Sequence, residues 1–549
     1  MNYISEFQKQ RYKYSPKIPK ILEQPSQNIC TTEIDTEDLF KNEAISEFFP
    51  NTKNLKNIIF TNGKNKLSSK KQKIGVVLSG GQAPGGHNVI AGIFDSLKSA
   101  NENSELFGFL MGPQGLINGD YKILNKTDID MVRNTGGFDL IGSGRTKIES
   151  ESQISEVIKN IKKLDLDALI IIGGDDSNTN AAVLSEIFLR NNIKTKIIGI
   201  PKTIDGDLKN NFVEVSFGFD TACKFYSSLI GNLARDTVSA KKYWNIVKLM
   251  GRSASHITLE CALQVHPNIT LIGEEISKNK TSLNTIIENI CNVIIQRAEK
   301  GLNYGIILIP EGIIEFIPET KKLITELNNL WDEFENQNIS ILNFQNKKNW
   351  LKTKLSKEAY STLTYLPEEF ANQFLGLRDP HGNIVVSKIE TDKIFTSLIE
   401  ERLSKETQNK HKISILNFFY GYEGRALFPT NFDANYCYAL GKTAFLLALN
   451  NKTGYMACIK NLSKPPAKWQ PYGISLVRMM TMENRIGKQK PVIEKTLVDL
   501  NGKPYLHFLA ERDNWILNED YIYPETIQYF GPNKICNKIT TTLMLESQL

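Results

Sequence analysis

The sequence has few cysteines, and their arrangement gives them no structural role. The seven cysteines stand far apart and no CxxC motif occurs; they are Cys30, Cys223, Cys261, Cys291, Cys437, Cys458 and Cys536. An odd, scattered set of thiols indicates neither a disulfide framework nor a zinc site. We therefore expect reduced thiols and a cytoplasmic protein.

Long hydrophobic runs and blocks of one charge are absent as well. No stretch approaches the roughly 20 apolar residues of a membrane-spanning helix. The N-terminal MNYISEFQKQRYKYSPK lacks the apolar core of a secretory signal. Lysine and arginine total 66 against 60 acids, a net charge of +6 on 549 residues. These features predict no membrane and no nucleic-acid partner, and they are compatible with small anionic substrates.

What the sequence does contain is a series of short apolar runs, each ending in a polar loop with glycine. Runs of this kind, separated by helical patterns, are typical of parallel strands covered on both faces. Their spacing predicts an α/β fold in which two three-layer, Rossmann-like units face each other across a cleft. The runs are Ile74–Ser79, Asp167–Ile172, Lys196–Ile200, Tyr243–Met250, Tyr304–Ile309 and Ile413–Tyr422.

The same pattern suggests a division of the chain. Residues 1–70 are polar and read as an extension that packs on the surface or is partly mobile. We expect one α/β domain at 71–240 and a second at 241–455. A helical period within the second predicts an insertion at about 319–400. Residues 456–549 are expected to pack back on the first domain.

The loop after the first run is SGGQAPGGHN, with glycines at positions 80, 81, 85 and 86. Glycines after a strand let backbone N–H groups approach an anion closely. The pattern matches neither the dinucleotide fingerprint nor the P-loop. A tight turn without a ligand explains the glycines equally well.

The loop GGDDSN is more informative because Asp175 and Asp176 are adjacent at an expected helix N-terminus. One of them could simply cap the helix, but only one can. A carboxylate beside a phosphate is repulsive unless a cation lies between them. Mg²⁺, which binds one or two carboxylates together with phosphate oxygens, meets that need.

The loop PKTIDGD carries the most chemistry. Thr203, Asp205 and Asp207 alternate, so in an extended segment they point to one side, and Lys202 points to the other unless the loop turns after Pro201. Asp205 could accept a hydroxyl proton as a general base. Lys202 could neutralise charge on a transferring phosphoryl group. A plain polar turn is the alternative.

Arginines at positions 145, 252 and 425 follow glycine in GSGR, MGR and GYEGR. Arginine suits bidentate recognition of phosphate, although any one of them could serve an ion pair. Glu311, in ILIPEG, could accept hydrogen bonds from sugar hydroxyls or merely begin a turn.

Taken in order, GGQAPGGHN, GGDDSN, PKTIDGD, MGR, PEG and GYEGR resemble the phosphofructokinase family, most closely its long pyrophosphate-dependent branch. The resemblance runs from about residue 70 to near the C-terminus. It implies reversible, Mg²⁺-dependent phosphoryl transfer from pyrophosphate to the 1-hydroxyl of fructose 6-phosphate, a step of glycolysis. The products would be fructose 1,6-bisphosphate and phosphate, and the resemblance suggests a homodimer.

Carried over position by position, the resemblance makes Asp205 the catalytic base, with Thr203 as a phosphate contact and Asp207 as an assisting group. It makes Asp175 the metal ligand. It also implies that Gly81 and Arg145 contact the donor or the transferring phosphoryl group. The residues implied to hold the sugar phosphate are Met250, Gly251, Arg252, Glu311, Tyr422 and Arg425.

Two positions are expected to choose the donor. Relatives that use ATP typically carry glycine where Asp176 and Lys202 stand here. A carboxylate at 176 would fill and repel the place of the α-phosphate, and Lys202 would add charge for a compact donor. An ATP-dependent 6-phosphofructokinase, a non-catalytic regulatory subunit and another sugar phosphate acceptor remain alternatives. Which of Lys241, Lys242 and Tyr243 reaches a neighbouring subunit's 6-phosphate stays open.

Overall fold

The computed structural model describes residues 4–34, 43–63, 70–337, 339–376, 378, 383–407, 413–485 and 488–547. The chain divides into two compact units. The first comprises the chain up to Ala222 together with Tyr422–Thr496 and Ile527–Ser547, and the second consists mainly of Cys223–Gly421 and Leu497–Thr526. The division falls at 222/223 instead of the expected 240, and the segment after 456 is shared between the units.

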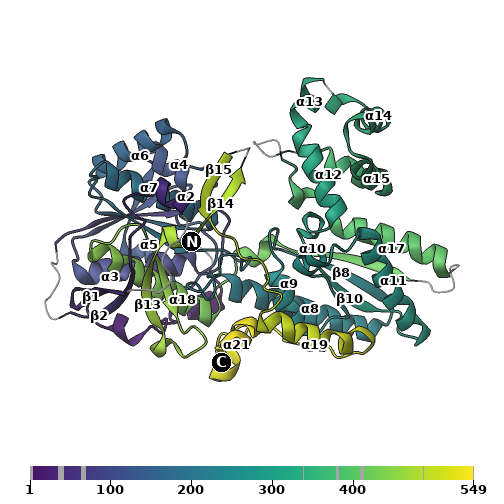
Figure 1. Ribbon diagram of the computed structural model, residues 1–549. Coiled ribbons are helices and arrows are strands. Elements are labelled where there is room, and N and C mark those ends of the chain that lie inside the picture. Colours follow the sequence, from purple (N-terminus) through teal and green to yellow (C-terminus); the bar gives the residue numbers. More distant parts are fainter. Residues whose placement is uncertain are drawn as a thin grey trace. The chain divides into compact units, whose positions relative to one another are not determined.

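The first unit contains a nine-stranded sheet (Figure 1). Its parallel centre consists, in order, of β4 (Glu105–Phe109), β3 (Lys73–Leu78), β6 (Ala168–Gly173), β7 (Lys196–Pro201) and β12 (Tyr455–Lys460). Antiparallel strands flank it: β5 (Tyr121–Leu124) beyond β4, and β13 (Gln470–Ser475), β2 (Asn57–Asn62) and β1 (Ile29–Ile34) beyond β12. The first three predicted strands are therefore confirmed as adjacent and parallel.

Helices cover both faces of this sheet, which explains why its central strands are apolar throughout. On one face α3 (Gly86–Ala100) packs against α18 (Asn431–Leu449). Two glycines permit their close approach, because a Cβ at Gly92 would lie 2.2 Å from the Tyr438 carbonyl oxygen, and one at Gly441 would lie 2.1 Å from that of Val89. On the other face α6 (Glu151–Leu164) and α7 (Asp175–Arg190) bury their apolar sides.

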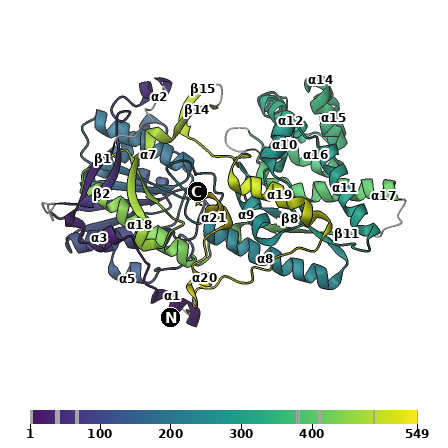
Figure 2. The ribbon, with the colours of Figure 1, turned by 60° about the horizontal axis from the view of Figure 1, so that its bottom comes forward.

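The N-terminal segment does more than cover a surface, which differs from the expectation for residues 1–70. Its strands β1 and β2 extend the sheet at one edge (Figure 2). Before them, α1 (Glu6–Tyr12) carries the fully buried Arg11. The Arg11 guanidinium donates to Asn431 Oδ1 at 2.8 Å and to the Pro429 carbonyl at 3.0 Å. The segment thus holds the start of α18.

The second unit has a smaller, fully parallel sheet in the order β11 (Ser414–Tyr420), β8 (Tyr243–Leu249), β10 (Gly305–Pro310) and β9 (Ile269–Thr270). The other three predicted strands are found here, which confirms the expectation of two sheets instead of one. Helices of this unit include α9 (His256–Val265), α10 (Gly273–Asn279), α11 (Leu283–Glu299), α17 (Thr391–Thr407) and α19 (Lys503–Leu517).

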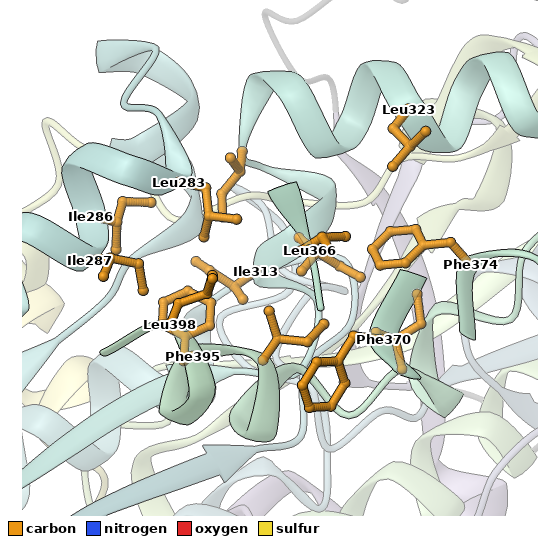
Figure 3. Packing of buried hydrophobic residues seen from close by; sticks show 14 of the residues in the cluster. Leu283, Ile286, Ile287, Ile313, Leu323, Leu366, Phe370, Phe374, Phe395 and Leu398 are labelled. Carbon is orange, nitrogen blue, oxygen red and sulfur yellow. The ribbon is translucent and has the colours of Figure 1, made fainter. Parts of the chain in front are cut away.

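The segment expected to be a helical insertion forms α12 (Pro318–Asn329), α13 (Trp331–Asn336), α14 (Phe344–Lys354), α15 (Lys357–Tyr365) and α16 (Glu368–Phe374), followed by α17. It does not build a separate core. Its apolar side chains join those of α11 and α17 in one cluster (Figure 3). Members of this cluster include Leu283, Ile286, Leu323, Phe370, Phe374, Phe395 and Leu398.

All seven cysteines are free thiols. Among the residues described, no helix is long and apolar enough to cross a membrane.

Candidate active site

The loops after β3, β6 and β7 meet at the carboxyl edge of the first sheet, where open α/β sheets bind ligands. They surround a cavity of about 320 Å³ that lies wholly within the first unit. Many of the residues singled out from the sequence line it together. These are Gly81, Arg145, Asp175, Asp176, Lys202, Thr203, Asp205, Asp207 and Arg425.

One wall of the cavity is basic, and Gly81 lies beside its arginines. A Cβ at Gly81 would lie 3.5 Å from Arg425 Cζ and 3.6 Å from Arg145 Nη2. The preceding Gly80 has a φ of +85°, which a side chain rarely adopts, and its N–H donates to the Gly144 carbonyl at 2.8 Å. The glycines thus keep a space beside two guanidinium groups, as the recognition of an anion requires.

Another wall of the cavity is acidic. Asp175 and Asp176 form the first turn of α7, where carboxylates are favoured by the helix dipole. Lys147 Nζ lies 3.2 Å from Asp176 Oδ1. Lys495 Nζ lies 3.5 Å from Asp175 Oδ2 and 3.9 Å from Asp207 Oδ2. Burial raises the pKa of Asp175, and Lys495 opposes this rise.

The acidic wall fits a divalent cation. One ammonium group lies within 4 Å of both Asp175 and Asp207, so the two carboxylates converge on a single cationic point. Within the described part of the chain, no group of three or more His, Cys, Asp or Glu side chains could hold a metal ion. Mg²⁺ usually binds one or two carboxylates together with phosphate oxygens and water, and two carboxylates are what this wall offers.

The third loop turns sharply after β7. Gly206 has a φ of +74°, and Lys202 faces the same cavity as Thr203, Asp205 and Asp207. The turn after Pro201 that the sequence left open is therefore present. The loop is fixed by hydrogen bonds from the Asp205 N–H to Thr203 Oγ1 at 3.0 Å and from Ser216 Oγ to the Thr203 carbonyl at 2.9 Å.

Lys202 is almost completely buried, with 5% of its surface exposed. Burial is the main cause that lowers the pKa of its ammonium to about 8, and the neighbouring Arg425 adds to the effect. Asp205 acts in the opposite direction. Lys202 therefore stands among the cations Arg425 and Arg145, with Asp205 and Asp175 opposing their effect on its pKa. Clustered cations of this kind suit the binding of a compact, highly charged ligand.

A second hollow of about 310 Å³ continues past Asp176 along α7. It shares Lys147, Asp176 and Asn180 with the first cavity, and apolar residues such as Val183 and Pro491 line it further on. The Lys147–Asp176 ion pair therefore stands at the boundary between the two spaces. The structure leaves room beyond this boundary.

The residues expected to hold the sugar phosphate lie in both units. Met250, Gly251, Arg252 and Glu311 belong to the second unit and follow β8 and β10 at the carboxyl edge of its sheet. They are close together, since the Glu311 N–H donates to the Leu249 carbonyl at 2.8 Å and a Cβ at Gly312 would lie 1.8 Å from the Arg252 carbonyl oxygen.

Tyr422 and Arg425, the remaining two, belong to the first unit. They form one 3₁₀ turn, in which the Arg425 guanidinium lies 4.8 Å from the centre of the Tyr422 ring. Of these six residues, Arg425 lines the cavity formed by the loops after β3, β6 and β7.

Sequence reasoning missed Lys147 and Lys495. Lys147 stands two residues after Arg145, so the polar loop GSGRTK was a usable signal. Lys495 comes from the far C-terminal part of the chain, within an unremarkable IEKT. Only the fold brings it to Asp175 and Asp207.

Comparison with known proteins supplies a family. The sequence profile described as "Phosphofructokinase" matches residues 73–448. A Treponema pallidum (strain Nichols) protein named "Pyrophosphate--fructose 6-phosphate 1-phosphotransferase" is 47% identical over 556 residues, covering 99% of this chain and 97% of that protein. A Porphyromonas gingivalis protein of the same name is 48% identical over 542 residues, covering 98% of each.

Solved structures agree on the fold. A crystal structure titled as pyrophosphate-dependent phosphofructokinase from Marinobacter aquaeolei superposes with a TM-score of 0.52 at 15% identity, covering 85% of this chain and 97% of that one.

Proposed function

Since this chain belongs to the phosphofructokinase family, we propose that it transfers a phosphoryl group reversibly between pyrophosphate and the 1-hydroxyl of fructose 6-phosphate. The observation that carries the proposal is the single cavity shared by Asp205, Lys202, Asp175 and Asp176. It combines a proton acceptor, cations for a compact anion and carboxylates for a metal. The relatives with this name match nearly the whole chain.

The roles that we propose use the residues lining this cavity. Asp205 takes the proton from the 1-hydroxyl as the oxygen attacks the phosphoryl group. Lys202, Arg145 and Arg425 neutralise the charge that develops on the phosphoryl oxygens. Mg²⁺ held by Asp175 would supply further neutralisation of the donor oxygens. Thr203 contacts the phosphate, and Asp207 supports the acidic wall.

In the second unit, we propose that Met250, Gly251, Arg252 and Glu311 are contacts of the sugar phosphate. In the first unit, we propose the same role for Tyr422 and Arg425. Arg252 supplies the charge for a phosphate, and Glu311 accepts hydrogen bonds from sugar hydroxyls.

A paired assay with pyrophosphate and with ATP tests the donor. We expect turnover with pyrophosphate and little with ATP. Asp176→Gly, alone or with Lys202→Gly, removes the carboxylate at the boundary, joins the cavity to the hollow along α7 and should admit ATP. Loss of the charged contact at 202 should weaken pyrophosphate use about 10²–10³-fold, as the loss of one preorganised donor does in other enzymes.

The matched control is Glu149→Gln, which lines only the outer hollow. Strong turnover of the unaltered enzyme with ATP and none with pyrophosphate would refute the donor assignment. A double variant that still excludes ATP would refute the role of the boundary.

We extend the proposal to a cytoplasmic homodimer. The free thiols suit a reducing compartment. The homodimer rests on the resemblance to the long pyrophosphate-dependent branch of the family. Light scattering after gel filtration should give about twice the chain mass of 62.1 kDa, and a mass of one chain would contradict the dimer.

A further inference from the structure

Lys495 lies between two carboxylates that different elements bring into the cavity. Its Nζ is 3.5 Å from Asp175 Oδ2, in the first turn of α7, and 3.9 Å from Asp207 Oδ2, in the loop after β7. The three side chains are only 31%, 22% and 10% exposed, so solvent screens their charges less than on an open surface. This is a lysine of the catalytic cavity, and no sequence motif identified it.

The main chain on either side of Lys495 is hydrogen-bonded to α7 and to the loop after β7, which carry these two carboxylates. Lys495 stands two residues after the end of β15 (Lys488–Ile493). At that end, the Ile493 N–H donates to Thr179 Oγ1 of α7 at 2.9 Å. The Thr496 N–H donates to the Asp207 carbonyl at 2.8 Å. Residue 495 is thus held against both acid-bearing elements, although it lies beyond the family match that ends at residue 448.

The neighbouring carboxylates explain why an ammonium group stabilises this part of the cavity. Asp176 and Asp207 both act to raise the pKa of Asp175, whereas Lys495 acts to lower it. Carboxylates that share a site repel one another unless a cation lies between them. In the protein without donor, Lys495 provides that cation. A divalent ion that binds the same carboxylates must compete with it.

We propose that Lys495 is a further residue of the pyrophosphate site, an inference that rests on the proposed function. Its ammonium first pairs with two carboxylates and then binds the donor. Without donor, its ammonium pairs with Asp175 and Asp207. With the donor and its metal bound, Asp175 and Asp207 would hold the metal and the Lys495 ammonium would bind an oxygen of the donor. Lys495 then favours entry of metal and pyrophosphate together and disfavours binding of the metal alone.

The test compares Lys495→Met with Lys495→Arg and with the control Lys490→Met. Lys490 is on β15 and pairs loosely with Glu149 at 3.9 Å, outside the donor cavity. We expect Lys495→Met to raise the KM for pyrophosphate about 10–100-fold, the loss of one charged contact, with the KM for fructose 6-phosphate unchanged. Arginine at 495 should restore most of the pyrophosphate affinity, and Lys490→Met should match the unaltered enzyme.

A second measurement does not depend on turnover. Calorimetric titration with Mn²⁺ alone should show tighter binding to Lys495→Met, because the competing ammonium is gone. Equal or weaker Mn²⁺ binding, or an unchanged KM for pyrophosphate, would overturn the proposal. Circular dichroism and the melting temperature verify that each variant is folded.

The two proposals can fail separately. If the unaltered enzyme transfers no phosphoryl group from pyrophosphate, the proposed function fails, while calorimetry with Mn²⁺ and with pyrophosphate still reports on Lys495. If transfer occurs and both binding measurements are insensitive to residue 495, only the role of Lys495 fails.

Discussion

Asp205→Asn is expected to lower kcat by about 10²-fold or more, the usual contribution of a general base. The amide keeps the size of the side chain but cannot accept the proton of the 1-hydroxyl. The backbone of the loop should persist, because its hydrogen bonds use the Asp205 N–H, Thr203 Oγ1 and Ser216 Oγ. Steady-state kinetics in both directions, with calorimetry of fructose 6-phosphate binding, separates chemistry from binding.

The control for this variant is Asp120→Asn. Asp120 is a carboxylate outside the cavity that accepts a hydrogen bond from the exposed Asn118 side chain. It should leave kcat unchanged. A normal rate for Asp205→Asn would remove residue 205 from its role and point to another acceptor in the cavity. A loss of sugar phosphate binding in parallel with the rate would indicate damage to the site instead.

Lys202→Met is expected to lower kcat/KM for pyrophosphate about 10²–10³-fold, as the loss of one preorganised donor does in other enzymes. Methionine has nearly the same length, so the buried volume is preserved while the charge is lost. The effect should be on pyrophosphate binding and transfer, because Lys202 and Gly80 line the same cavity. The Lys202 Nζ lies 3.2 Å from the position that a Cβ at Gly80 would take.

The same lysine predicts a pH dependence. Burial, with help from Arg425, lowers its pKa to about 8. The ammonium is charged below this value, so kcat/KM for pyrophosphate should fall as the pH rises through about 8. Lys202→Met should lack this alkaline decline, whereas Lys159→Met, on the exposed side of α6, should retain it. A profile of the unaltered enzyme that stays flat well above pH 8 would contradict the assignment.

The strands that position the site could be predicted from the sequence. A strand buried on both faces must be apolar along its whole length, and it must end where polar groups reach solvent. Ile170 to Asp176 and Ile198 to Asp207 show both properties. Since the carboxyl ends of parallel strands meet at one edge, Asp175, Lys202 and Asp205 were expected to share a site, and they line one cavity.

Other parts of the fold could not be predicted, because their patterns are ambiguous over short lengths. The sequence of β2, β12 and β13 does not reveal which sheet these strands join, since that depends on pairing between segments hundreds of residues apart. The helical segment after Pro318 was expected as an insertion. Its apolar faces nevertheless pack into the core of the second unit, which only the path of the chain decides.

By itself the sequence determined the chemistry at the strand ends, because residue types and their order along one loop are local properties. Tertiary structure decided which charges face them. Lys147 reaches Asp176 from a different loop, and Lys495 reaches Asp175 and Asp207 from the far end of the chain. An ion pair requires two groups to meet in space, and the spacing of residues along a sequence does not fix that distance.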